Sequence, residues 1–414
     1  ITDCTFNLSG ETNLINESGV GFNQETRVKM AVGDYVTLEN CTIKIDSGKC
    51  TSYTGNDCAL GFFGTNTVNN STITANIWDG NCIGFFGNAN VTFTNSQLST
   101  TAVTTGWSYA MFNTTTLTLD ASTMEATKMD KGSSRNVNVF YSGDAVQNNV
   151  YVKNSSNIHF YGNIAGGFAL NHSNFYVNDS TITIEDNAGN ASNSGYWFLT
   201  NSEINILSNG GHGLSCNSVE SHNSKILSWD NGECGIYTTN LYIDKDSHVT
   251  LTENCKTSTK YPALLIRGNS TVEFGADLLI SNNYRSGIDI LGGEINILSG
   301  VITNNGGRIR EDGNISYGEM GGGIYSQNAK LTISDDVQIF NNQSRDCGDD
   351  LHLQSGSISF YNITKENDAI LNETQLPITG WYIDGNLNGT ATKRWKQDTQ
   401  EDSYQLFNSF DENG

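Results

Sequence analysis

Proline, charged residues and long apolar runs are all scarce in this chain. Its 414 residues include only 2 Pro, Pro262 and Pro377, against 43 Gly. Proline has no N–H, so within a sheet paired on both sides it would break a hydrogen bond to a neighbouring strand. Charged residues make up 16% of the chain, compared with roughly a quarter in an average soluble domain. This composition argues against a helical enzyme and favours a continuously paired β structure.

Basic residues are outnumbered two to one by acidic residues. The 22 Lys and Arg minus 44 Asp and Glu give a formal net charge of −22. Such a surface repels phosphate backbones and anionic lipid headgroups, so we expect no nucleic-acid partner. No stretch approaches the roughly 18 consecutive apolar residues that a membrane span needs, so we expect no membrane insertion.

The composition also fits an exported protein. Nine Cys in an anionic, Lys-poor chain are typical of an oxidising compartment, although the odd number leaves at least one thiol unpaired. We expect the segment to belong to a larger exported chain, with a signal peptide and an anchor outside it. About seventeen Asn-x-Ser/Thr sequons occur. They would be glycosylation acceptors in a eukaryotic secretory host, but the abundance of Asn, Ser and Thr accounts for many of them by chance.

A repeat organises most of the chain. The pattern Ser-x-apolar-x-apolar-x-x-Asn begins at Ser156, Ser180, Ser202 and Ser247, with looser copies before, between and after these. The apolar positions lie two residues apart, which is the period of a strand with one buried face and excludes a helical repeat. Three short strands and their turns fill about 22–25 residues, the length of one coil of a parallel β-helix. We therefore predict an all-β solenoid built from a single chain, with roughly a dozen coils.

The Asn that ends each repeat has a physical reason to recur. A chain that turns from one sheet to the next needs residues compatible with the left-handed region, and stacked Asn side chains can exchange amide hydrogen bonds between coils. We predict a cap and first coil over residues 1–50, the solenoid over 51–360, and a capping element over 361–414. Insertions over Thr127–Asn136 and Gly307–Met320 interrupt the repeat, and repeat proteins usually bind through such loops.

One part of the repeat resembles a known family. The runs Gly321-Gly-Gly-Ile-Tyr-Ser, Leu331-Thr-Ile-Ser and Ile339-Phe-Asn-Asn are similar to the GGGI and FxxN signatures of polymorphic outer-membrane-protein repeats. They also resemble right-handed parallel β-helix, adhesin-like surface proteins of bacteria. The resemblance covers about residues 280–353. It implies a right-handed coil, display on a bacterial cell surface and a role in adhesion, and it names no receptor.

One motif resembles a catalytic coil of polygalacturonases, which are enzymes with the predicted fold. Gly211-His212-Gly213 is similar to their Gly-His-Gly coil, but the only Gly-Asp-Asp begins at Gly348, about five coils away. An inverting hydrolase needs its two carboxylates on either side of one bond, so His212 is better read as a corner or surface histidine. Arg267 and Arg285 on neighbouring coils lack the Asp cluster of a pectate-lyase site, and Asp277 and Asp289 are as readily a solvated pair. Asp346, Asp349 and Asp350 suit a hydrogen-bonded corner better than a Ca²⁺ site.

Cysteines and tryptophans supply the remaining candidates. Cys58 and Cys82 share similar contexts 24 residues apart, so they are disulfide candidates if they stack on adjacent coils. Cys216, Cys234 and Cys255 could form a second bond, or all these thiols could be buried and reduced. No CxxC spacing exists, so we expect no zinc, and no other metal or cofactor is implied. We expect Trp78, Trp107, Trp197 and Trp229 to face outward, and Trp197, Trp229 and His212 are the weak candidates for binding.

These observations lead to a ranked set of functions. The first is a non-enzymatic surface adhesin that binds a host protein, such as a mucosal glycoprotein or immunoglobulin, or a glycan, through a face of the solenoid or an inserted loop. The alternative is a polysaccharide lyase or glycoside hydrolase that works in a groove along the coil. A third is a stalk that only spaces another domain from the cell wall.

Overall fold

The computed structural model describes most of the repeat region. The described residues are 1–9, 15–17, 26–47, 58–77, 81–101, 108–112, 115–127, 138–142, 147–162, 167–311, 313–316, 318–334 and 336–361. The predicted capping element over 361–414 therefore lies outside them, Tyr361 apart, and so does the insertion after Thr127. The chain divides into two compact units, Ile1–Asn205 and Ile206–Gly414.

Unit 1 is a stack of parallel strands, as predicted, with an antiparallel pair near its start. One sheet has the order β1 (Thr5–Ser9), β5 (Thr42–Ser47), β7 (Thr72–Ile77), β9 (Gln97–Thr101), β12 (Thr123–Thr127), β15 (Asn157–Tyr161) and β17 (Thr181–Glu185). The strands between them form a second sheet: β2 (Ile15–Glu17), β3 (Thr26–Val32), β4 (Val36–Glu39), β6 (Cys58–Asn69), β8 (Asn81–Thr94), β10 (Ser108–Phe112), β11 (Thr116–Asp120), β13 (Asn138–Ser142), β14 (Asn149–Lys153), β16 (Phe168–Asn178) and β18 (Ser192–Thr200). Strand β19 (Glu203–Leu207) crosses the boundary between the units.

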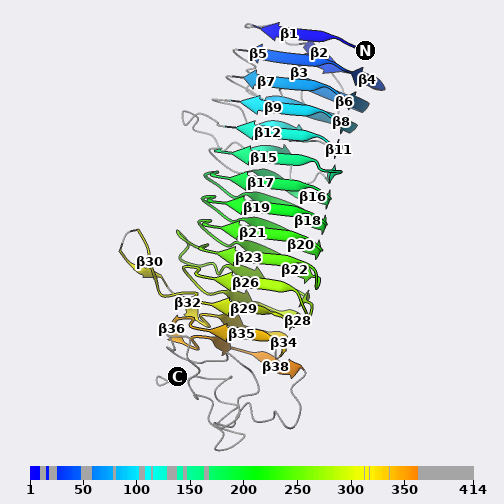
Figure 1. Ribbon diagram of the computed structural model, residues 1–414. Coiled ribbons are helices and arrows are strands. Elements are labelled where there is room, and N and C mark those ends of the chain that lie inside the picture. The colour runs from blue at the N-terminus through cyan, green and yellow to red at the C-terminus, as the bar shows by residue number, and fades with distance from the viewer. Residues whose placement is uncertain are drawn as a thin grey trace, which may run out of the picture. The chain divides into compact units, whose positions relative to one another are not determined.

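Unit 2 repeats this arrangement (Figure 1). Its first sheet contains β21 (Lys225–Trp229), β23 (His248–Thr252), β26 (Asp277–Ser281), β29 (Gly300–Thr303) and β35 (Val337–Phe340). The second contains β20 (Leu214–His222), β22 (Ile236–Ile243), β24 (Leu264–Ile266), β25 (Ser270–Val272), β27 (Ile288–Ile290), β28 (Gly293–Ile297), β33 (Ile324–Ser326), β34 (Ala329–Ser334), β37 (Leu351–Leu353) and β38 (Gly356–Tyr361). The insertion adds β30 (Arg308–Ile309), β31 (Ile315–Ser316) and β32 (Gly318–Met320), and β32 pairs with β36 (Ser344–Cys347).

The period-2 pattern sets the core of each unit. In β17 the buried side chains are Ile182 and Ile184, and the residues between them are partly exposed. Ile182 lies directly opposite Ile158 of the preceding coil, 24 residues earlier. Because the register repeats from coil to coil, one face of every strand contributes to a continuous apolar column. The predicted all-β parallel solenoid, with coils of about 25 residues, is therefore confirmed.

Stacked serines close one corner of the coils in unit 1. The backbone N–H of each serine donates to Oγ of the serine on the next coil at 3.0 to 3.2 Å, through Ser71, Ser96, Ser122, Ser156, Ser180 and Ser202. The residue before each of these serines has a positive φ, between 46° and 64°. These bonds satisfy backbone groups that the corner would otherwise leave unpaired. The first position of the repeat is thus a corner residue.

Stacked asparagines close another corner in unit 2. The column runs through Asn209, Asn231, Asn254, Asn283, Asn305 and Asn342. Each Asn donates both its backbone N–H and its Nδ2–H to Oδ1 of the next member, at 2.8 to 3.2 Å. This confirms the predicted amide stacking. The left-handed conformation, however, belongs to the residue just before each stacked Asn, with φ of 52° to 58° at Ser208, Asp230, Glu253, Asn282, Asn304 and Asn341.

No helix that could cross a membrane occurs among the described residues.

Candidate functional site

The corner of unit 2 that follows the stacked asparagines carries the inserted hairpin. After Asn305, Gly306 and Gly307 turn the chain away from the coil with φ of 74° and 67°. A Cβ on Gly306 would lie 2.0 Å from the carbonyl oxygen of Gln343, so this turn requires glycine. Strands β30 and β31 then pair in antiparallel fashion, and the hairpin projects from the stacked strands of unit 2 (Figure 1). The insertion predicted at Gly307–Met320 is therefore confirmed as an excursion from the coil.

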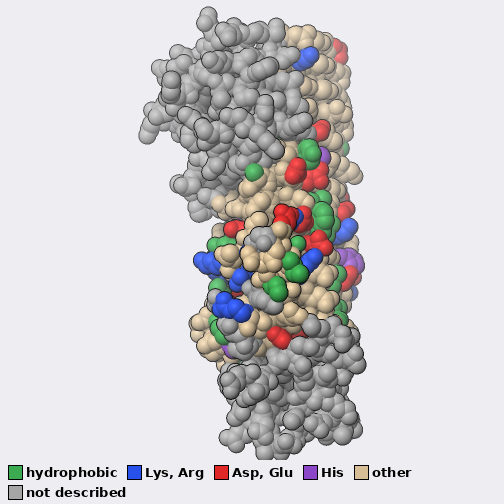
Figure 2. All heavy atoms as spheres, turned by 90° about the vertical axis from the view of Figure 1, so that its left-hand side faces the viewer, with side chains coloured by type: hydrophobic (Ala, Val, Ile, Leu, Met, Phe, Trp, Pro, Cys, Tyr) green, Lys and Arg blue, Asp and Glu red, His purple; other side chains and the backbone are tan. Residues whose placement is uncertain are grey.

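Charged side chains fix this hairpin to the corner. Glu311 pairs with Lys256 at 3.1 Å, and Lys256 also lies 3.5 Å from Asp230. The Arg308 guanidinium lies over the Tyr284 ring, 4.7 Å from its centre, and 3.8 Å from Glu253. Basic and acidic side chains are both seen on this side of the molecule (Figure 2). Exposed ion pairs contribute little singly, but several contacts together define one position for the hairpin.

Arg310 is the most enclosed of these anchors. Its guanidinium donates to the carbonyl oxygen of Ser258 and, at 2.8 Å, to Oγ of Ser316. Its Nε is buried and makes no hydrogen bond within the described part of the chain. Arg310 thus connects the hairpin to a loop 52 residues earlier in the sequence.

Two isoleucines on the hairpin face solvent. Ile309 of β30 and Ile315 of β31 are direct cross-strand partners. Their side chains are 68% and 52% exposed, which makes Ile309 the most exposed isoleucine or leucine of the described chain. Isolated exposed apolar residues are ordinary, but a cross-strand pair on a projecting, anchored hairpin is a compact apolar contact surface. Sequence reasoning located the insertion but not this pair.

His212 lies at the same corner, and both of its ring nitrogens are engaged. Nδ1 accepts the backbone N–H of Cys234 at 3.2 Å, so Nε2 carries the proton and donates to Oε2 of Glu233 at 2.9 Å. Tyr261 packs edge-on against the ring, with centres 4.7 Å apart. Burial lowers the pKa of His212 to about 4 and raises the pKa of Glu233 above its ordinary value. His212 is therefore a neutral corner histidine near pH 7, and its role in binding stays a prediction.

Asp349 and Asp350 accept hydrogen bonds within the fold and lie far from His212. Oδ1 of Asp349 accepts hydrogen bonds from N and Oγ of Ser344, and Oδ1 of Asp350 accepts from Asn342. These contacts of Asp349 and Asp350 agree with the predicted hydrogen-bonded corner. The side chain of Asp346 lies outside the described atoms. No group of three His, Cys, Asp or Glu side chains suited to a metal occurs among the residues that the structure describes. About six strand spacings, roughly 29 Å, separate His212 from Asp350 along the corner.

The carboxyl group of Asp289 is enclosed, in contrast to the solvated pair with Asp277 that the sequence allows. Its Oδ1 is buried and lacks a hydrogen-bond partner within the described residues, and burial raises the pKa of Asp289 to about 7. Arg285 acts against this increase. Asp277, by contrast, is exposed and lies 3.0 Å from Nδ1 of His248. The two aspartates therefore do not form a pair.

The two candidate tryptophans differ in burial. Trp197 is fully buried, stacks on Phe175 with ring centres 4.4 Å apart, and donates its Nε1–H to Oγ of Ser194 at 2.7 Å. The prediction that Trp197 faces outward for binding is therefore wrong. Trp229 is 39% exposed and does face outward, and its role in binding stays a prediction. Trp78 and Trp107 lie outside the described residues.

The cysteines do not support the predicted disulfides. Cys58 lies opposite Asn81 in the parallel register of β6 and β8, so Cys82 is offset by one residue and the predicted direct stack is wrong. The side chains of Cys58 and Cys82 lie outside the described atoms. Cys216, Cys234 and Cys255 are free, buried thiols, which bears out the reduced alternative for these three. Burial raises the pKa of each.

Comparison with known proteins finds no relative: no family model matches the chain, and no match occurs among curated proteins or solved structures.

Proposed function

We propose that this chain is a non-enzymatic, cell-surface binding protein of the adhesin type, and that the tip of the β30–β31 hairpin contacts a partner protein. The observation that carries the proposal is the exposed cross-strand pair Ile309 and Ile315. At protein interfaces a few well-packed residues near the centre carry most of the binding free energy, and this centre is more apolar than the rim. The Gly-Gly-Gly-Ile and Phe-Asn-Asn motifs near residues 321 and 340 add a resemblance to adhesin repeats.

The anchoring of the hairpin supports this role. Arg308, Arg310 and Glu311 each contact a different residue of the corner loops, so the tip is held before a partner arrives. A contact surface that is ordered in advance loses less conformational entropy on binding. The expected partner is a mucosal glycoprotein or an immunoglobulin, and the expected location is outside the cell on a bacterial surface.

The alternative function, a polysaccharide lyase or glycoside hydrolase, gains no support from His212, its main candidate for a catalytic residue. A general base must be able to reach a substrate proton, but the two nitrogens of His212 already bond to Cys234 and Glu233. The acidic residues of the Gly348-Asp-Asp corner lie several coils away. A specific observation in favour of hydrolase or lyase chemistry is lacking for the described residues.

A binding assay on the whole chain tests the proposal. The chain would be immobilised and exposed to purified mucosal glycoproteins and immunoglobulins, and the paired variant Ile309→Ser/Ile315→Ser is expected to weaken saturable binding at least tenfold. Leu291→Ser is the matched control, because Leu291 is an exposed aliphatic residue of the same unit outside the hairpin. Unchanged binding by the paired variant, or release of reducing or unsaturated sugars from a polysaccharide panel, would overturn the proposal.

A further inference from the structure

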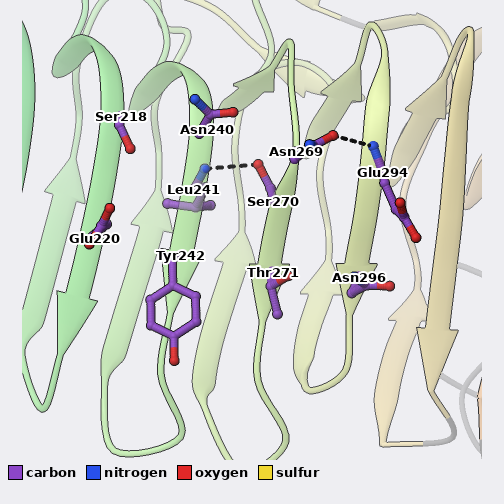
Figure 3. A pocket seen from close by; sticks show the side chains of 10 residues that line it. All are labelled: Ser218, Glu220, Asn240, Leu241, Tyr242, Asn269, Ser270, Thr271, Glu294 and Asn296. Atoms are coloured by element: carbon purple, nitrogen blue, oxygen red, sulfur yellow. Dashed lines mark hydrogen bonds between the residues drawn. The ribbon is translucent and has the colours of Figure 1, made fainter.

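A shallow groove lies on the outer face of the second sheet of unit 2, away from the hairpin. Its volume is about 310 Å³. Figure 3 shows its lining side chains on four neighbouring strands, β20, β22, β25 and β28. Three strand spacings of about 4.8 Å give the groove a length of roughly 14 Å. That length suits an extended oligomer better than a single small molecule.

Eight of the ten lining residues form two parallel rows of side chains with polar groups, and Leu241 and Ser270 lie between the rows. The register places Glu220, Tyr242, Thr271 and Asn296 side by side in one row. The second row, two residues earlier on each strand, contains Ser218, Asn240, Asn269 and Glu294. Parallel strands in fixed register repeat these groups at one spacing across the groove. The surface is therefore a regular array of amide, carboxylate and hydroxyl groups.

Some of these groups hold the groove in shape. Oγ of Ser270 accepts the backbone N–H of Leu241 at 2.9 Å, and Oδ1 of Asn269 accepts the backbone N–H of Glu294 at 3.0 Å (Figure 3). The Tyr242 hydroxyl donates to Oε1 of Glu273 at 2.6 Å, and this bond raises the pKa of Tyr242 to about 12. The phenol therefore stays protonated, and its oxygen is left as an acceptor.

Other polar side chains in the lining are not used in hydrogen bonds within the described chain. The side chains of Asn240, Asn296, Glu220 and Glu294 make no hydrogen bond or ion pair with the described residues. This differs from the hairpin corner, where Lys256, Arg308 and Arg310 are all used in internal contacts. Two amides and two carboxylates thus present unused donors and acceptors along one groove.

The charge of the groove restricts the ligand. Its lining includes two carboxylates and no Lys or Arg, so a phosphate, sulfate or uronate polymer would be repelled. A mainly apolar ligand would leave the amides and carboxylates desolvated without partners. A neutral chain of hydroxyl groups can both donate to the carboxylates and exchange hydrogen bonds with the amides.

We propose that this groove is a binding site for a neutral oligosaccharide. The two rows contact hydroxyl groups of successive sugar units, with Asn240 and Asn296 as donors and acceptors and with Glu220 and Glu294 as acceptors. The site is independent of the hairpin, so the chain would hold a glycan and a protein partner at separate surfaces. The glutamates are not an acid and base pair for hydrolysis, since the strands that carry them are three spacings apart, roughly 14 Å, and glycosidases need about 5–9.5 Å.

The test uses the full chain on an array of neutral, sialylated, sulfated and uronate oligosaccharides, followed by calorimetric titration with the strongest neutral binder. Neutral oligosaccharides are expected to bind and anionic ones are not. Asn240→Ala/Asn296→Ala is expected to weaken binding at least tenfold, about 1.4 kcal/mol. Thr332→Ala is the matched control, because Thr332 continues the same row one strand beyond the groove.

Three results would overturn the site: no glycan binding, binding of anionic glycans only, or unchanged affinity in the paired Asn variant. The Ile309→Ser/Ile315→Ser variant separates this proposal from the hairpin proposal. It is expected to keep full oligosaccharide affinity while it loses the protein partner. Loss of both activities in that variant would contradict the independence of the two surfaces.

Discussion

Asn342 donates both its backbone N–H and its side-chain amide to Oδ1 of Asp350, at 3.1 and 3.0 Å. Every earlier member of the buried column in unit 2 uses an asparagine as the acceptor. Asp350 takes the position that the next asparagine would occupy, only eight residues further along the chain. The column therefore ends on a side chain that needs only to accept.

Replacement of Asp350 tests this arrangement. Asp350→Ala leaves the buried backbone N–H of Asn342 without a partner, while Nδ2 of Asn342 keeps its bonds to the carbonyl oxygens of Ile302 and Phe340. The free energy of unfolding should therefore fall by about 1–3 kcal/mol. Asp350→Asn keeps an acceptor oxygen at the same place and should cost well under half of that. Urea unfolding followed by far-ultraviolet circular dichroism measures both variants. Equal destabilisation by Ala and Asn would contradict the acceptor role.

His212 gives the fold a pH dependence of known sign. Its pKa is about 4 in the folded protein and 6.5 in the unfolded chain. Between these values the unfolded chain binds more protons at His212 than the folded chain does. The free energy of unfolding therefore rises as pH increases from about 4 to 6.5, and the contribution of His212 has its full value above that range. Glu233, whose pKa is raised, opposes this change. The pH-dependent contribution of His212 to the free energy of unfolding is at most about 3–4 kcal/mol.

His212→Gln should flatten that slope, because Gln can accept one bond and donate the other without titrating. Urea midpoints measured from pH 4 to 7 provide the test. His248→Gln is the control, since the side chain of His248 is 61% exposed and its ring bonds only to the exposed Asp277 within the described chain. A slope in His212→Gln as steep as that of the unmodified protein would count against the assignment.

Asp289 should act in the opposite direction to His212. Its pKa is about 7 when folded and 3.8 when unfolded, so the folded chain binds more protons between these values. Stability should therefore decrease as pH rises from 3.8 to 7. Asp289→Asn, which removes the buried charge, should be more stable than the unmodified protein at pH 8 by about 1–4 kcal/mol.

The extra stability of Asp289→Asn should almost disappear near pH 3.5, because the carboxyl group of Asp289 is then mostly protonated in both the folded and the unfolded chain. Asp277→Asn, at an exposed aspartate of the same unit, is expected to leave stability unchanged to within about 0.5 kcal/mol. Thermal and urea unfolding at pH 3.5 and pH 8 distinguish these outcomes. A loss of stability at pH 8 in Asp289→Asn would show that the carboxylate is needed in its charged form.

The two tryptophans offer a direct comparison of burial. Trp197→Ala removes a fully buried ring that stacks on Phe175, and it should cost about 3–5 kcal/mol. Trp229→Ala should cost about 1 kcal/mol or less, because its side chain is 39% exposed. Acrylamide quenching of single-tryptophan variants checks the exposure directly. Strong quenching of Trp197 in the native state would contradict its placement in the core.

Much of the fold follows from the sequence. Apolar residues two apart, repeated about every 22–25 residues, require short strands, and a chain with almost no proline can pair each strand with both neighbours. The repeated Asn predicted the amide column, because an amide can donate and accept at once. The break in the repeat after Gly307 predicted an inserted loop, which the structure shows to contain a hairpin. The sequence did not show that Ile309 and Ile315 pair across it, because that depends on the turn between them.

The facing of single side chains depended on register, which only the tertiary structure decided. In β18, Ser194 and Gly195 are buried in succession, and this break in alternation turns Trp197 into the core. The partner strand β16 has a register shift between Leu170 and Asn174. A one-residue offset likewise separates Cys58 from Cys82. Because a shift of one residue moves a side chain to the opposite face, small irregularities that composition does not reveal have large effects.

The groove in unit 2 could not be predicted from the sequence either. Its lining extends from Ser218 to Asn296 in the sequence, and no local motif marks it. Apart from the buried Leu241, each lining residue is an ordinary polar residue of the kind found all along the chain. Only the stacking of four coils in register places Asn240 and Asn296 in one groove. The sequence therefore determined that coils form and where they turn, and the packing of coil on coil determined which of their side chains act together.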